Sequence, residues 1–124
     1  MNIHYISEQN SILNHFLAQL RDVNIQKDSM RFRKNIERIG EIMAYELSKT
    51  LPYKDVEVET PLGVKKTTVI EDNVVLCSIL RAGLALHTGF MNFFDDAENG
   101  FVSASRIHAP KGEIAEIKVE YQAA

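Results

Sequence analysis

The chain runs Val74-Val75-Leu76-Cys77-Ser78-Ile79-Leu80-Arg81-Ala82-Gly83 through its middle, an apolar run that ends in arginine, alanine and glycine. A run of this length, rich in Val, Ile and Leu, is typical of a strand buried on both faces in a parallel sheet. The three residues at its end would form a loop at the carboxyl end of that strand, where open α/β sheets bind ligands. We therefore expect a ligand-binding edge at Arg81.

A helix and a second strand are predicted after this loop. Apolar spacing predicts a helix from Leu84 to Phe94, and residues 101–104 predict a short strand. Strand, helix and strand at this spacing form a βαβ unit with parallel strands. A loop is predicted at residues 108–112, and residues 116–121 alternate charged and apolar side chains, which predicts a half-exposed strand.

Two helices and a hairpin are predicted ahead of the central strand. Ser11 is the expected N-cap of the first helix and Ser29 that of the second, which we expect Pro52 to end. The second helix carries an apolar stripe of Phe32, Ile36, Ile39, Met43 and Leu47. Residues 56–60 and 64–70 flank a Pro-Leu turn, which predicts a hairpin outside the central sheet.

The predicted elements fall within a single domain, residues 1–124. Leading helices would occupy residues 1–52, the hairpin residues 53–72, and the start of an α/β core residues 73–124. A parallel sheet normally needs further strands and helices to cover both of its faces. We therefore expect an α/β fold that is truncated before its C-terminal half, the front part of a larger fold.

Charge and composition exclude several classes of partner. The formal net charge is −3, with 45% hydrophobic and 25% charged residues, as in an ordinary globular domain. Nothing in this balance favours nucleic acid or an anionic membrane as a partner, so the positive charge for any anionic ligand has to be local. The sequence has neither the roughly 18 apolar residues of a membrane span nor a signal peptide, and a cytoplasmic location is expected.

The cysteine, the histidines and the acidic residues do not indicate a further functional site. Cys77 is the only cysteine, which excludes an internal disulfide, and its place in the apolar run predicts a small core residue. The four histidines show no metal-ligand spacing, and we expect a packing or interface role for His87. The acidic group of Asp95, Asp96 and Glu98 favours a solvent-exposed turn over a metal site.

Two arginines are candidates for anion binding. Arg81 would point a planar, permanently charged group into a cleft, beside a glycine and the N-terminus of the next helix, which suits phosphate or diphosphate. The alternative is that Arg81 begins a loop and pairs with a surface carboxylate. Arg106 follows the second strand, and parallel strands would bring both arginines to one edge. The alternative for Arg106 is a solvated loop side chain.

The residues from Ser78 to Leu84, with Arg106 twenty-five positions after Arg81, resemble the uracil phosphoribosyltransferase family. The resemblance extends upstream, through Arg31-Phe32-Arg33 and the rest of the second helix to the hairpin strand that ends at Pro61. That family has an α/β fold built on a parallel sheet. The likeness therefore covers the whole chain, but only somewhat more than half of the family's length.

This resemblance implies a reaction, in which uracil and 5-phosphoribosyl diphosphate give UMP and diphosphate with Mg²⁺ present. It implies that Arg81 contacts the diphosphate, that Ala82 and Gly83 form the backbone of its loop, and that Arg106 is a second diphosphate-binding arginine. It also implies a homo-oligomer, either dimer or tetramer. Some members use GTP as an allosteric activator, a point on which this sequence is silent.

The chain departs from the family pattern in two respects. Ser105-Arg106 stands where the family usually has Tyr-Arg, and the Asp-Pro-Met-Leu-Ala-Thr-Gly type loop and the C-terminal uracil-binding segment are missing. No catalytic residue, no metal ligand and no contact to uracil or the 5-phosphate can therefore be assigned. We expect the 124-residue chain alone to be inactive.

Three interpretations remain open from the sequence. The first is the N-terminal part of an enzyme of pyrimidine salvage. The second is a non-catalytic fragment that serves as an oligomerisation or interaction module of the same fold. The third is a truncated piece that does not fold well alone.

Overall fold

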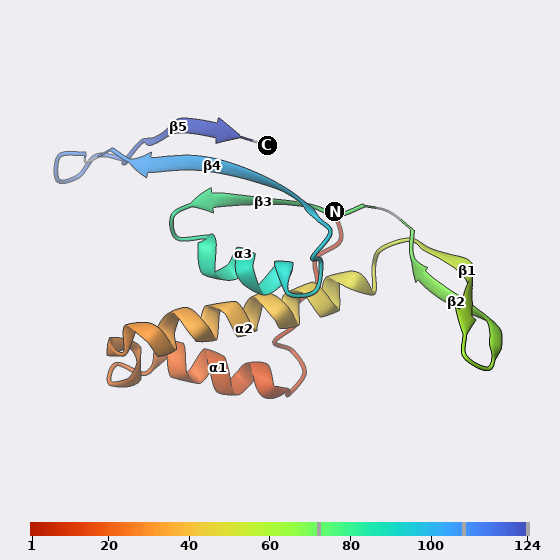
Figure 1. The fold of residues 1–124 in the computed structure, drawn as a ribbon. Helices are drawn as coiled ribbons and strands as arrows, with labels where there is room; N and C mark the ends of the chain where they lie inside the picture. The colour runs from red at the N-terminus through yellow and green to blue at the C-terminus, as the bar shows by residue number, and fades with distance from the viewer. Residues whose placement is uncertain (72, 108, 124) are drawn as a thin grey trace.

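The computed structural model of the chain describes residues 1–71, 73–107 and 109–123. Helix α1 (Ile12–Arg21) packs on α2 (Ser29–Ser48), and α2 packs on α3 (Leu84–Met91). Helix α3 in turn lies against a three-stranded sheet (Figure 1). The fold is therefore a stack of helices on one face of a sheet, with a hairpin projecting from one end.

Helix α1 begins where the sequence predicts. The Leu13 amide donates to the Ser11 side-chain oxygen at 3.2 Å, so Ser11 is the N-cap. Leu13 itself is only 2% exposed, which makes it the anchor of α1 on the helical layer. A short 3₁₀ turn, Ile25–Lys27, then leads into α2.

The predicted cap of α2 is wrong by one residue. Asp28, not Ser29, is the N-cap, and its carboxylate accepts from the Arg31 amide at 3.1 Å. An acidic side chain is stabilised by the positive end of the helix dipole, which favours Asp28 over its neighbour. The helix also ends at Ser48, so Pro52 lies beyond its end rather than terminating it.

The predicted apolar stripe of α2 marks its buried side only in part. Phe32 is 36% exposed and Leu47 is 44% exposed. The buried residues of this helix are Asn35, Gly40 and Ala44. Helix α2 is packed between α1 and α3, and these two contacts, rather than one face, determine which positions are covered.

The hairpin forms a separate two-stranded sheet, as predicted. Strands β1 (Tyr53–Thr60) and β2 (Gly63–Ile70) pair antiparallel from Tyr53↔Ile70 to Thr60↔Gly63. Gly63 has a φ of 131°, a conformation that favours glycine. The hairpin extends away from the other layers (Figure 1), and Leu62 at its tip is fully exposed.

The central sheet has the order β3-β4-β5. Strands β3 (Val75–Leu80) and β4 (Glu98–Arg106) are parallel and joined through α3, which confirms the predicted βαβ unit. Strand β5 (Ile117–Ala123) pairs antiparallel with β4, so the sheet is mixed rather than wholly parallel. The connection between β4 and β5 is too short for a crossover, which leaves an antiparallel return.

The prediction that the central strand is buried on both faces is wrong. Leu76 is 8% exposed, but Val75 is 63% and Ile79 is 62% exposed. Cys77 is also exposed, so it is not the small core residue that the sequence suggested. Helix α3 covers one face of β3, whereas no helix of the described residues covers the other face (Figure 1).

Strand β5 is less buried than its alternating pattern predicts. Ile117 is 73% exposed and Val119 is 51% exposed, because among the described helices and strands only β4 packs extensively against this strand. In the predicted loop before it, His108 lies outside the described residues. The rest of that loop includes Gly112, with a φ of 103°.

The apolar core is small and lies where α2, β3 and the end of the α3 segment meet. Its buried members are Ala44, Leu76 and Phe94. Partly buried residues surround them: Leu51, Ile70, Val74, Phe90 and Ala97. Among the helices described, none has both the length and the apolar character needed to cross a membrane.

Candidate functional site

The loop of Arg81-Ala82-Gly83 joins the end of β3 directly to α3. The Gly83 amide donates to the Ile79 carbonyl at 3.0 Å, which folds the loop back onto the strand. A Cβ on Gly83 would lie 2.7 Å from that same carbonyl oxygen, closer than side-chain carbons approach. The turn therefore requires glycine at this position, as the motif suggested.

Arg81 and Arg106 lie at the same edge of the sheet. Strand β3 pairs in parallel with β4 from Val75↔Glu98 to Leu80↔Ser103, so the carboxyl ends of both strands point the same way (Figure 1). Both arginines are exposed, and neither forms an ion pair with another described residue. The surface-carboxylate alternative for Arg81 therefore has no partner in the described part of the chain.

The first turn of α3 adds a second source of positive potential to this edge. Gly83 is the N-cap of the helix and supplies no side-chain hydrogen bond to its first amides. The unpaired amides of a helix N-terminus favour anions, although the effect is confined to the first turn. Two exposed guanidiniums and this helix start together suit a ligand with several negative charges.

A buried polar cluster lies between α3 and the two parallel strands. The ring of His87, in α3, contacts the Ser78 hydroxyl through Nδ1 at 2.6 Å and the Asn99 Oδ1 through Nε2 at 2.7 Å. The side chain is 7% exposed and its ring lies 5.1 Å from that of Phe101. The predicted packing role of His87 is thus confirmed, with hydrogen bonds to two strands.

The acidic residues do not form a metal site in the described structure. Among the described residues, no group of three or more His, Cys, Asp or Glu side chains is arranged so that it could hold a metal ion. Asp95 and Asp96 are exposed in the turn after α3, and Glu98 begins β4. This turn lies at the opposite end of α3 from Arg81, so it contributes no charge to the arginine edge.

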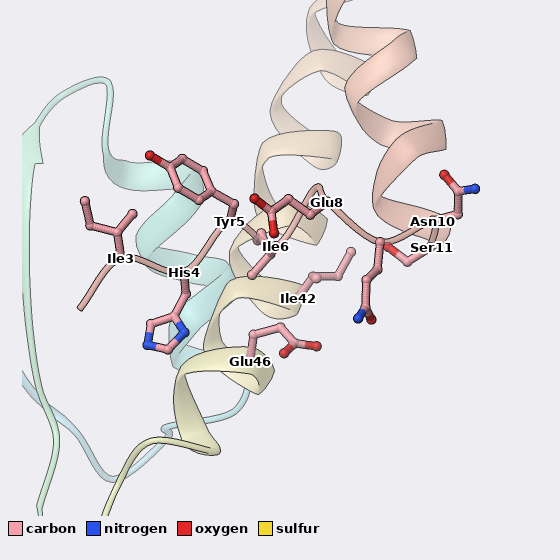
Figure 2. Close-up of a pocket in the computed structure, with 10 residues that line it drawn as sticks. Ile3, His4, Tyr5, Ile6, Glu8, Asn10, Ser11, Ile42 and Glu46 are labelled. Atoms are coloured by element: carbon pink, nitrogen blue, oxygen red, sulfur yellow. The ribbon is translucent and has the colours of Figure 1, made fainter.

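A hollow of the described surface lies elsewhere. It measures about 520 Å³ and is formed where the irregular first residues cross α2, from which Ile42 and Glu46 project toward the segment (Figure 2). The hollow is open and includes neither arginine of the sheet edge. Size alone therefore does not make it a better ligand site than the edge, where the chain places preorganised charge.

Several structurally important residues were not identified as such from the sequence. Ser78 and Asn99 hold His87, and the only local signal was a polar residue on the inward face of an apolar strand. Gly40 and Gly89 allow α2 and α3 to touch, yet in the sequence Gly89 is merely a poor helix former. Both signals depend on neighbours that are distant along the chain.

The fold is an α/β arrangement of the phosphoribosyltransferase type. The family model described as "Uracil phosphoribosyltransferase" matches residues 6–116. The chain therefore belongs to the uracil phosphoribosyltransferase family.

Relatives with that name occur in bacteria and archaea. A uracil phosphoribosyltransferase of Porphyromonas gingivalis is 48% identical over 98% of this chain and 56% of its own length. That of Thermococcus gammatolerans is 42% identical over 89% of this chain and 49% of its own length. The chain thus spans about half the length of the curated relatives it matches.

A solved structure is similar in fold. A protein from Aquifex aeolicus superposes with a TM-score of 0.77 at 24% identity, over 94% of this chain and 53% of its own. At this identity the likeness concerns the fold alone. It agrees with the mixed α/β arrangement of this chain.

Proposed function

We propose that this chain supplies the diphosphate-binding part of a uracil phosphoribosyltransferase of pyrimidine salvage. The observation that supports this most directly is the parallel pairing of β3 and β4, because it puts Arg81 and Arg106 at one edge. The substrates would be uracil and 5-phosphoribosyl diphosphate, and the products UMP and diphosphate. Arg81, Ala82 and Gly83 would bind the diphosphate group, with Arg106 as the second cationic contact.

The chemistry of this reaction explains why two arginines are needed. The bond between the ribose and the diphosphate breaks as the bond to the uracil nitrogen forms, and the negative charge of the leaving diphosphate increases. Arginines held in place before the reaction stabilise that charge without reorganising. The planar fork of Arg81 can also bind two diphosphate oxygens at once.

Magnesium fits this proposal as a partner of the substrate. The described residues offer no carboxylate cluster at the arginine edge, and Mg²⁺ commonly binds through phosphate oxygens and water. The cation would further neutralise the diphosphate. Magnesium, GTP activation, the cytoplasmic location and the dimer or tetramer stay predictions.

The proposal is tested with the purified 124-residue chain. Calorimetric titration with inorganic diphosphate and magnesium should detect binding, which Arg81→Ala should weaken about tenfold and Arg21→Ala, on the exposed last turn of α1, should leave unchanged. We expect no UMP from uracil and 5-phosphoribosyl diphosphate with this chain alone. UMP formation would show that the residues missing relative to the family are dispensable, and an absence of diphosphate binding would contradict the proposal.

A second function, an oligomerisation or interaction module, is favoured by a different observation. Val75 and Ile79 expose apolar surface on the uncovered face of β3, and Leu62 and Val64 do so on the hairpin. Exposed apolar surface of this kind commonly marks an interface. Light scattering after size exclusion would favour this function if the chain were a folded oligomer without affinity for diphosphate.

A further inference from the structure

His87 contacts the elements on both sides of the arginine loop, through its buried ring and through its main chain. Ser78, on β3, is three residues ahead of Arg81, and the main-chain amide of His87 donates to the Gly83 carbonyl at 2.9 Å. The ring thus contacts the strand that enters the loop, while the backbone of the same residue contacts the helix start that leaves it. No other described side chain forms hydrogen bonds to both β3 and β4.

The directions of these hydrogen bonds follow from the surrounding groups. The Asn99 amide nitrogen donates to the Ala97 carbonyl at 3.1 Å, which leaves Asn99 Oδ1 as the acceptor toward His87. His87 Nε2 therefore donates to Asn99 Oδ1, and Nδ1 pairs with the Ser78 hydroxyl. Each polar atom of the cluster has one partner, so the ring has a single orientation.

This single orientation is what distinguishes the cluster from ordinary packing. An apolar side chain at position 87 could fill the space, but it would leave the Ser78 hydroxyl and the Asn99 oxygen without a partner. Because the ring bonds to β3 and β4 together, it fixes the register of α3 against the two strands whose ends carry Arg81 and Arg106. A small shift of α3 would move the loop relative to Arg106.

We infer that His87, held by Ser78 and Asn99, is a positioning residue for the diphosphate loop at Arg81-Ala82-Gly83. This inference rests on the proposed function, since it assigns the residue that preorganises the same site. His87 touches no ligand in this scheme. Its contribution is to keep the loop ordered before the diphosphate arrives, which lowers the entropy cost of binding.

The test combines diphosphate titration with amide hydrogen exchange on the 124-residue chain. His87→Leu removes both hydrogen bonds of the ring. Ser78→Ala removes only one of them, so it provides the test if His87→Leu does not fold. His15→Leu is the matched control, because His15 lies exposed on α1. We expect His87→Leu and Ser78→Ala to weaken diphosphate binding about tenfold, and His15→Leu to leave it unchanged.

Exchange at individual amides separates positioning from general stability. The amides of Gly83 and His87 should exchange faster in both variants, whereas that of Phe94, which lies beyond the end of α3 and donates to the Phe90 carbonyl, should not. Variants that melt at a lower temperature but keep wild-type diphosphate affinity and loop exchange would overturn the inference. Nitrogen-15 NMR should also find the His87 proton on Nε2, and a proton on Nδ1 instead would overturn it.

These measurements distinguish a failure of the inference from a failure of the proposed function. If the unaltered chain does not bind diphosphate, the proposed function fails, and loop exchange alone then decides on His87. Faster exchange confined to the loop would support the positioning role in that case. Unchanged exchange at Gly83 would refute it.

Discussion

Gly40 in α2 and Gly89 in α3 bring the backbones of two helices into contact. A Cβ built on Gly40 would lie 3.2 Å from the Gly89 Cα and 2.6 Å from the Leu86 carbonyl oxygen. A Cβ on Gly89 would collide with the Glu37 carbonyl of α2. Helix α3 also packs against β3, the strand that leads into the arginine loop. Its contact with α2 therefore sets how closely the leading helices approach the candidate site.

Substitution of Gly89 by alanine distinguishes packing from helix propensity. Alanine is the better helix former by about 1 kcal/mol, so propensity alone predicts a more stable protein. The contact with α2 predicts the opposite sign, a loss of about 2 kcal/mol, since the obstacle is backbone that cannot rotate away. Thermal and urea denaturation measure the difference, with Thr88→Ala on the exposed side of α3 as control. A rise in melting temperature for Gly89→Ala would contradict the contact.

The start of α2 gives a test at two neighbouring residues. Asp28→Ala should lower the free energy of unfolding by about 1 kcal/mol, because the Arg31 amide loses its acceptor. Ser29→Ala, in the first turn of the same helix, should change it by less than about 0.5 kcal/mol. Urea denaturation measures both variants, and if Ser29 were the cap, Ser29→Ala would be the less stable of the two.

Acid should weaken the contact between α2 and α3 through Glu37. The Lys34 ammonium donates to this carboxylate at 3.1 Å and, with a hydrogen bond from Asn92, lowers the pKa of Glu37 below its usual 4.5. A carboxyl group whose pKa is lower in the folded state stabilises the fold above 4.5, and this contribution is lost as the pH falls through the lowered pKa.

Glu37→Gln should therefore reduce the loss of stability between neutral pH and pH values below 4.5. Urea denaturation across that range measures the slope, and Glu113→Gln, in an exposed loop, is the matched control. The pair between Lys34 and Glu37 lies at the surface on the lysine side, so the effect should also shrink in high salt. Identical pH slopes for the unaltered chain and Glu37→Gln would exclude this role.

Most of the helices and strands could be predicted because the signals that mark them lie close together in the sequence. The cap at Ser11, the period of α1 and the Pro-Leu turn of the hairpin each act within a few residues. The βαβ unit could also be predicted, since the order of strand, helix and strand nearly determines parallel pairing. The family motif then identified the loop at residues 81–83.

Burial could not be predicted in the same way, because it depends on what lies opposite each face. Val75 and Cys77 belong to an apolar run that suits a doubly covered strand, yet α3 covers only the other side. Whether position 89 requires glycine likewise depends on its contact with α2, some fifty residues earlier in the chain. The hydrogen bonds of His87 connect three elements, and no spacing in the sequence indicates them.

Arg81 and Arg106 can be tested as a pair, since the proposal requires both to bind one diphosphate. Each alanine variant should weaken diphosphate binding about tenfold, and Arg81→Lys should recover only part of the loss because an ammonium lacks the planar fork. Since the two guanidiniums would share a ligand, the loss in the double variant should differ from the product of the single losses. Titration at two salt concentrations should also give a weaker salt dependence for each variant than for the unaltered chain, whereas Arg21→Ala should not. Strictly multiplicative losses, or losses no greater than that of Arg21→Ala, would mean that the shared edge of β3 and β4 does not hold a common ligand.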